Sequence, residues 1–282
     1  MNTAPGAGIM PPLPDRLTLI AISALAYVIG VALHEHLGHA LACTALGSHP
    51  TEMGAYYVNC DDARLSSLRI RLVELAGPFV SVLTGVVCLQ LLRRLPPLTG
   101  AGFYFLWLLG ALGLMDAAGY ALFSGASGQG DLGTTSDGAL YGATPEWLWR
   151  VGLFLVGAVA YRWVMRIAVA AIEPRVSGTG DGRVRSARLT ALTSYLTGGA
   201  VAVLIGLLNP QGIVIVVLSS IASSLGGTIG FLFMMQWLKR QPDVPGPGIY
   251  FARSWGWIAV AAVVTVAYAA IFGPTLRPWG SS

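Results

Sequence analysis

Ionisable side chains gather in one short string, Leu33-His34-Glu35-His36-Leu37-Gly38-His39-Ala40, at the end of a long apolar segment. The string holds three of the four histidines of the chain, and the fourth, His49, follows ten residues after His39. Charged groups in or beside a membrane cost free energy, and they mark functional sites by default. Imidazoles and a carboxylate are also ligands that zinc takes in proteins. We therefore expect the chemistry of this protein to take place at this string, on a bound metal ion.

The composition predicts that a lipid bilayer surrounds this string. Hydrophobic residues make up 55% of the 282 residues and charged residues only 11%, whereas soluble domains carry about 25% charged residues. A spanning helix needs about 20 mostly apolar residues. Seven segments meet this requirement: 18–46, 70–92, 101–124, 147–171, 189–208, 212–238 and 254–273. The sequence therefore predicts an all-α polytopic membrane helix bundle of about seven transmembrane helices, or of six if one segment does not span.

The spacing of these segments predicts three parts of the chain. They are an N-terminal tail (1–17), a core of three helices with a polar loop (18–140) and C-terminal helices (141–282), for which we expect a scaffold role. The turn residues Asn209-Pro210-Gln211-Gly212 predict that the fifth and sixth helices form an antiparallel hairpin. Glycines such as Gly198 and Gly199 should let these helices pack closely, as small residues do in lipid.

The charged residues and the cysteines limit the possible partners. The net charge of +4 comes from scattered residues without a basic, aromatic-rich stripe, so we expect no nucleic acid partner. Lys and Arg are more frequent in the loops on the N-terminal side, which predicts a cytoplasmic N-terminus. Cys43, Cys60 and Cys88 predict neither a disulfide framework nor a cysteine metal site.

Three polar segments should converge at one face of the bilayer. If the first three helices alternate in direction, one side of the membrane carries the end of the first helix, the start of the second near Glu74 and the end of the third. The third helix leads into the Gly/Ser/Thr-rich stretch 124–138, and irregular backbone near a membrane is tolerated where it is buried or lines a wet cavity. Glu74 itself is expected to pair with Arg71 or Arg69 at the interface.

Helical geometry restricts which side chains of the string can share a metal ion. At about 100° per residue, Glu35, His36 and His39 lie on one face of a regular helix, and His34 lies about 140° from His39. His34 can join that face only if the turn widens into a π-bulge, which is frequent at functional sites. Catalytic zinc sites have three protein ligands and an open fourth position. A further acid must therefore come from another part of the chain.

The string His34–Leu41 resembles the H-E-x-G-H-A-L signature of the site-2 protease family of intramembrane zinc metalloproteases. The segment Glu74-Leu75-Ala76-Gly77-Pro78-Phe79-Val80-Ser81 is similar to the A-G-P-x-x-N segment that opens the next core helix in many members. The resemblance covers about residues 18–140. It implies one Zn²⁺ per chain, a peptide-bond substrate in a membrane protein or peptide, and a part for Gly77 and Pro78 in presenting that substrate.

The resemblance also implies an aspartate as the third zinc ligand, about ninety residues after the histidines. Asp131 has this separation, and Asp137-Gly138 has the D-G form that the family motif shows. Asp116 lies earlier and deeper in the third helix, where a hydrogen bond between helices is an equally good expectation. We name Asp131 as the ligand, with Asp137 and Asp116 as alternates.

The string departs from the family pattern, because the two outer histidines lie five residues apart instead of four. In one arrangement, a bulge restores His34 and His39 as ligands, and Glu35 acts as general base. In the other, Glu35 and His39 bind the metal, with His36 as a third ligand or a base. The first keeps protease chemistry intact, and the second makes it uncertain.

The expected function is therefore zinc-dependent hydrolysis of a membrane-associated protein substrate by an integral, multi-pass protein of a bacterial inner membrane. Two alternatives use the same residues: a catalytically inactive adaptor with a protease-like fold, and a metal or solute transporter, for which acids and histidines inside the membrane are also typical. Haem is not expected as a cofactor, because axial histidines usually come from different helices and all histidines here lie on one segment.

Overall fold

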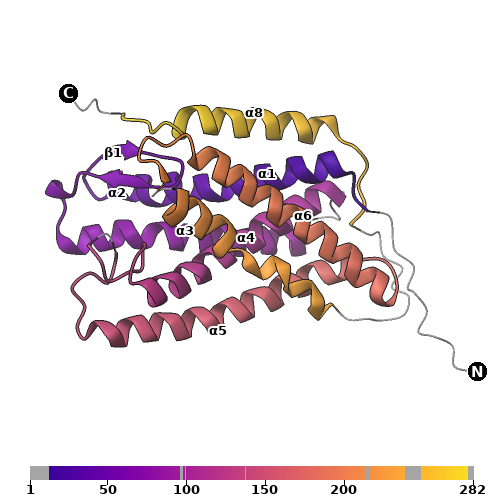
Figure 1. The fold of residues 1–282 in the computed structure, drawn as a ribbon, viewed down its shortest axis with the longest axis horizontal. Coiled ribbons are helices and arrows are strands. Elements are labelled where there is room, and N and C mark those ends of the chain that lie inside the picture. The colour runs from indigo at the N-terminus through magenta and orange to yellow at the C-terminus, as the bar shows by residue number, and fades with distance from the viewer. Residues whose placement is uncertain are drawn as a thin grey trace, which may run out of the picture.

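The computed structural model describes residues 13–95, 98, 100–136, 138–213, 216–238 and 249–278. They form the predicted all-α bundle, with six helical stretches long and apolar enough to cross a membrane (Figure 1). The first stretch is continuous from Arg16 to Ala45 and consists of α1 (Arg16–Ala32), the π-helix η1 (Leu33–Ala40) and α2 (Leu41–Ala45). The other long helices are α3 (Ser67–Arg94), α4 (Gly100–Ser127), α5 (Glu146–Ile172), α6 (Gly180–Gly206) and α8 (Trp255–Phe272).

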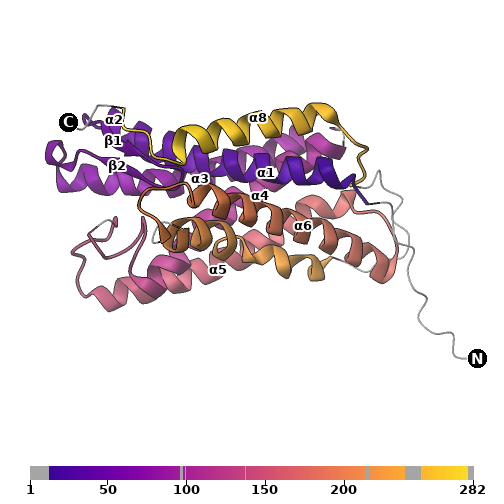
Figure 2. The same ribbon diagram turned by 45° about the horizontal axis from the view of Figure 1, so that its top comes forward.

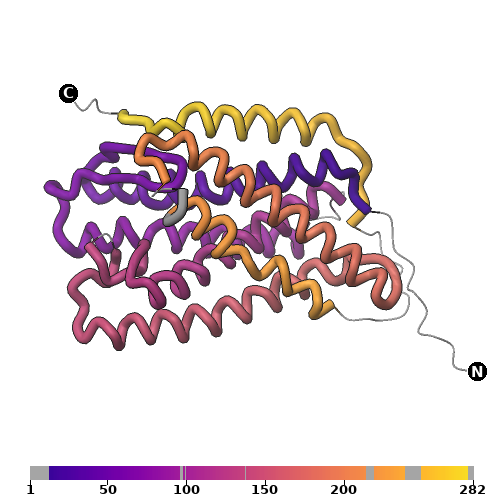
Figure 3. The backbone as a smooth tube through the Cα atoms, viewed as in Figure 1, coloured from indigo at the N-terminus to yellow at the C-terminus, as the bar shows by residue number. Residues whose placement is uncertain are grey.

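The segment 212–238 is not the continuous α-helix that its hydropathy predicts. Its described part is a π-helix, η4 (Val216–Gly226), followed by two short 3₁₀ turns, η5 (Ile229–Leu232) and η6 (Met234–Trp237). Serine and threonine hydroxyls bond to carbonyls four residues earlier, as Ser223 does to Ser219 at 2.7 Å, and such bonds weaken and bend helices. The segment returns beside α6, as the hairpin prediction requires (Figure 3).

Helix α4 forms the centre of the bundle. Tyr104, Trp107 and Met115 are fully buried on it, and the indole N–H of Trp107 donates to the Ala168 carbonyl of α5 at 2.8 Å. Glycines allow the neighbouring helices to approach, since a Cβ on Gly113 would lie 2.6 Å from the Ser81 carbonyl of α3. Small residues at such crossings are how helices pack in lipid. Helix α8 instead lies at the edge of the bundle beside α1 (Figure 2).

A two-stranded hairpin covers the end of the bundle that carries the histidines. Strands β1 (Pro50–Met53) and β2 (Val58–Cys60) pair antiparallel, and a disulfide joins Cys43 of α2 to Cys60 of β2. The expectation that the cysteines form no disulfide is therefore wrong for this pair. The hairpin folds back on α2 and brings the two Cα atoms to 6.0 Å, a proximity that the sequence spacing does not show. Cys88 is free and buried.

Candidate metal centre

The widened turn η1 brings His34 and His39 to the same face of the first helix. In a π-helix the backbone bonds link residues five apart, which is the spacing of these two histidines. Their Nε2 atoms lie 3.2 Å apart. Of the two arrangements that the sequence leaves open, the structure has the one with the bulge.

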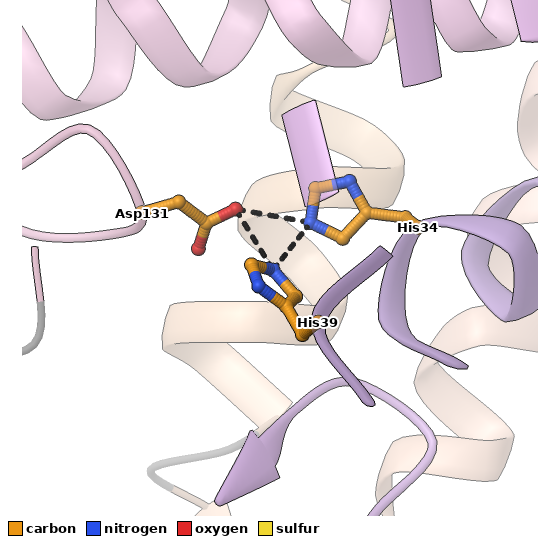
Figure 4. Close-up of side chains that lie close together, drawn as sticks. All are labelled: His34, His39 and Asp131. Atoms are coloured by element: carbon orange, nitrogen blue, oxygen red, sulfur yellow. Dashed lines mark hydrogen bonds and ion pairs between the residues drawn. The ribbon is translucent and has the colours of Figure 1, made fainter. Parts of the chain in front are cut away.

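Asp131 completes a triangle of ligand atoms with these histidines (Figure 4). Its Oδ2 lies 3.0 Å from His34 Nε2 and 3.3 Å from His39 Nε2. In a tetrahedral site with bonds of about 2.0–2.1 Å, ligand atoms lie roughly 3.3 Å apart. Both histidines are 4% exposed and the Asp131 side chain is 15% exposed. The three residues therefore fit one metal ion at a largely buried position.

The outer nitrogens of both imidazoles have partners that fix their protonation. His39 Nδ1 lies 2.8 Å from the Val73 carbonyl oxygen, which can only accept a hydrogen bond. His34 Nδ1 lies 3.0 Å from Asp116 Oδ2 and 2.9 Å from Ser81 Oγ, and Ser81 donates to the same Asp116 oxygen at 2.7 Å. With the hydrogen on Nδ1, each neutral ring turns the lone pair of Nε2 toward the triangle. Partners of this kind orient metal-binding histidines.

The loop position of Asp131 suits an anionic ligand. Asp131 follows α4, beyond the last residue of that helix, Ser127. Burial raises the pKa of its carboxyl group, but without a metal the protonated rings of His39 and His34 have the larger, opposing effect and hold the pKa well below its usual range. The carboxylate is therefore ionised at neutral pH.

Glycines set the approach of α3 to the triangle. A Cβ on Gly77 would lie 2.3 Å from His39 Nε2 and 2.6 Å from His34 Nε2, and a Cβ on Gly38 would lie 2.7 Å from the Gly77 Cα. Only glycine fits at these two positions, and this contact gives a physical reason for the glycines of both sequence motifs. Pro78 is buried within α3. A part for Gly77 or Pro78 in presenting substrate stays a prediction.

The structure does not bring the other candidate ligands into the triangle. His36 points to the opposite side, where it stacks on Phe272 of α8 with ring centroids 4.0 Å apart, so the alternative with His36 as ligand is not the one present. The widening that aligns His34 with His39 turns His36 away. Asp116 binds the far side of the His34 ring and is an outer partner instead of a ligand. Asp137 lies outside the described residues.

A cavity of about 610 Å³ opens beside the metal ligands. Glu35 and His39 border it from η1, Asp131 borders it from its loop, and Tyr120 borders it from α4. Tyr120 also stacks on the His34 ring, with centroids 4.9 Å apart. Glu35 is 5% exposed. The predicted general base Glu35 and two of the predicted ligands, His39 and Asp131, therefore border one cavity.

Two other parts of the cavity wall were not predicted from the sequence. The hairpin contributes Tyr56–Cys60, and the segment η4 with the residue after it contributes Ser219, Ala222, Ser223 and Gly227. The expectation of a plain scaffold is thus wrong for η4. A cluster of serines within an apolar span was the signal in the sequence, but serines in membrane helices also pair with their own backbone.

No protein-family model, curated protein or solved structure matches this chain. The functional assignment therefore depends on the geometry of the site itself.

Proposed function

We propose that this protein is an intramembrane zinc metallopeptidase of the site-2 protease type, which hydrolyses a peptide bond in a membrane protein or peptide. One observation carries the proposal: His39 and Asp131, two corners of the triangle that His34 completes, border the same cavity as the buried carboxylate of Glu35. A metal centre that only stabilised the fold would be closed by a fourth protein ligand. Three ligands beside a cavity leave the fourth position to water or substrate.

Zinc is the metal that this donor set favours. Two neutral imidazole nitrogens and one carboxylate oxygen at tetrahedral spacing are typical of catalytic zinc sites. His34, His39 and Asp131 would hold one ion per chain. When bound, zinc lowers the pKa of water toward 7 and polarises a carbonyl oxygen.

The side chains around the site would carry out the proton transfers. Glu35 borders the cavity and directly follows a ligand, so its carboxylate would accept the proton of the attacking water and return it to the departing amine, as expected for a glutamate in an H-E motif. Asp116 and Ser81 would hold the His34 ring in place during the reaction. The largely buried site would keep bulk water from the reacting bond.

We also propose that the cavity faces the side of the membrane opposite the cytoplasm. The disulfide Cys43–Cys60 lies at the cavity end of the bundle, and disulfides form in oxidising compartments. The opposite end carries Arg93 and Arg94 at the end of α3 and Arg175 after α5. Loops rich in Lys and Arg are cytoplasmic. Both features favour a cytoplasmic N-terminus.

Metal analysis of purified variants tests the site. We expect about one zinc per chain in the wild type and loss of the metal in His39→Ala. His36→Ala is the matched control, because this neighbouring histidine points away from the triangle and its loss should leave zinc content unchanged. Full retention of zinc in His39→Ala would overturn the site.

Cleavage of a single-span test substrate in proteoliposomes tests the activity. Glu35→Gln should abolish cleavage and keep zinc, because this residue is placed as a base and not as a ligand. An inactive adaptor would bind zinc and cleave nothing in either form. A transporter would move metal ions into the vesicles, and uptake that survives Glu35→Gln without any cleavage by the wild type would replace the peptidase proposal.

A further inference from the structure

The cavity beside the metal ligands is lined by carboxylates. Glu35, Asp62, Glu74, Asp116 and Asp131 all border it, and no described lysine or arginine does. Asp116 and Asp131 lie against the two histidines. Glu35 and Glu74 make no hydrogen bond or ion pair with another side chain in the described part of the chain. Two carboxylates therefore face the cavity without a fixed counter-charge.

The arginines nearest to Glu74 in sequence are bound elsewhere, which corrects the expected pairing. Arg71 Nη2 donates to the Tyr141 carbonyl at 2.8 Å, and Arg69 Nη1 donates to the Leu46 carbonyl at 3.2 Å. Arg64 forms an ion pair with Asp61 at 2.8 Å. These contacts hold the loops around the cavity, and none of the three guanidinium groups pairs with Glu74.

Glu35 adds an independent observation. Its side chain is 95% buried, since only 5% is exposed, and it borders the cavity without a protein partner. A carboxylate out of water without a partner is costly. The metal ion would compensate Glu35, which directly follows the ligand His34, whereas no arginine or lysine in the described part of the chain pairs with Glu74.

We infer that Glu74 binds a basic side chain, lysine or arginine, that the substrate carries beside the bond to be cut; this inference rests on the proposed function. A carboxylate forms strong, charge-assisted hydrogen bonds with ammonium and guanidinium groups. The cavity wall also contains the aromatic rings of Tyr57, Tyr120 and Phe123, against which the apolar stem of such a side chain packs. The substrate class is thus a membrane segment with a basic residue near its end.

Peptide binding to the purified protein in detergent tests this inference separately from catalysis. Three fluorescein-labelled apolar peptides would differ at one position near the end of the apolar segment, which carries lysine, the uncharged isostere norleucine, or glutamate. We expect the lysine peptide to bind about 5- to 10-fold more tightly than the norleucine peptide, as for one added hydrogen bond of ordinary strength. The glutamate peptide should bind most weakly, and the lysine preference should shrink as salt is raised.

Variants assign the preference to Glu74. In Glu74→Gln the preference for lysine should fall to about twofold or less, whereas Glu74→Asp should retain most of it. Glu52→Gln is the matched control, because Glu52 lies on β1 in an ion pair with Arg277, outside the cavity wall. Equal binding of the lysine and norleucine peptides, or a lysine preference that persists in Glu74→Gln, would overturn the inference.

Cleavage of the same peptides separates this inference from the proposed function. A lysine preference in binding without cleavage of any peptide would support the basic side-chain site and overturn the peptidase. Cleavage of the lysine and norleucine peptides at equal rates, with equal binding, would support the peptidase and overturn the basic side-chain site.

Discussion

Deletion of His36 would test whether the widened turn is what builds the metal centre. The deletion leaves the string His34-Glu35-Leu37-Gly38-His39, in which the two ligands are four residues apart. On a regular α-helix, side chains five residues apart point about 140° apart and side chains four residues apart point about 40° apart. The π-helix η1 should therefore close to an α-helix while both imidazoles still face Asp131.

The contacts of His36 indicate that its loss costs little. Neither ring nitrogen has a hydrogen-bond partner among the described residues, and an unpaired buried polar group costs about 1–3 kcal/mol. Stacking on Phe272 returns about 0.5–1.5 kcal/mol. The two effects nearly cancel, so we expect the free energy of unfolding to change by no more than about 1–2 kcal/mol and the zinc affinity to stay within about tenfold of the wild type, a difference of about 1.4 kcal/mol.

Zinc content and competition with a chromophoric chelator would measure both expectations. Deletion of Ala32 is the matched control, because it removes a residue of α1 just before η1 and turns His34 by about 100° relative to the preceding helix. The control should lose zinc. If a folded His36 deletion bound no zinc, or if the Ala32 deletion bound it normally, the role assigned to the widened turn would be refuted.

Four further predictions follow from single contacts. Asp116→Ala should weaken zinc binding about 10- to 100-fold, as loss of an outer partner does, and Ser81→Ala should weaken it less because Asp116 still accepts from His34 Nδ1; equal affinity in Asp116→Ala and the wild type would contradict this. Gly77→Ala should lose zinc because its Cβ would lie 2.3 Å from His39 Nε2, whereas Gly85→Ala crowds only the Leu114 side chain and the Gly110 backbone and should keep it. The double variant Cys43→Ser, Cys60→Ser should be about 3 kcal/mol less stable in denaturant titrations, as for a closed loop of this length, with Cys88→Ser as the control. The Thr18 N–H and Arg253 lower the pKa of Asp15 at the start of α1. The contribution of Asp15 to stability is therefore present above its pKa in the unfolded chain, near 3.9, and is lost as the pH falls through its lower pKa in the folded protein. The difference in Tm between the wild type and Asp15→Ala should be larger at pH 7 than at pH 2.

Local patterns in the sequence were sufficient to predict the elements of the bundle. Apolar runs of spanning length predicted α1, α3–α6 and α8, and the turn at 209–212 predicted that the next segment would return beside α6. The ligand pair His34 and His39 could be predicted only as one of two arrangements. The choice depends on whether η1 widens, and in the widened turn Gly38 packs against Gly77 and His36 against Phe272. These contacts join residues 39 and 236 positions apart and leave no trace in local periodicity.

The wall formed by η4 could not be predicted for a different reason. Its serines carry no charge, so nothing in the sequence distinguishes a cavity wall from a scaffold helix with backbone-bonded hydroxyls. Two residues after η4, Thr228 ties this wall to the first helix about two turns before His34, because the hydroxyl groups of Tyr27 and Thr228 are hydrogen-bonded at 2.9 Å. Irregular backbone at membrane depth is stable where it is buried or lines a polar cavity. The wide turns of η1 and η4 both border the same cavity, so each is placed where the departure from α-helical geometry is best tolerated, and the site is formed by the two halves of the chain together.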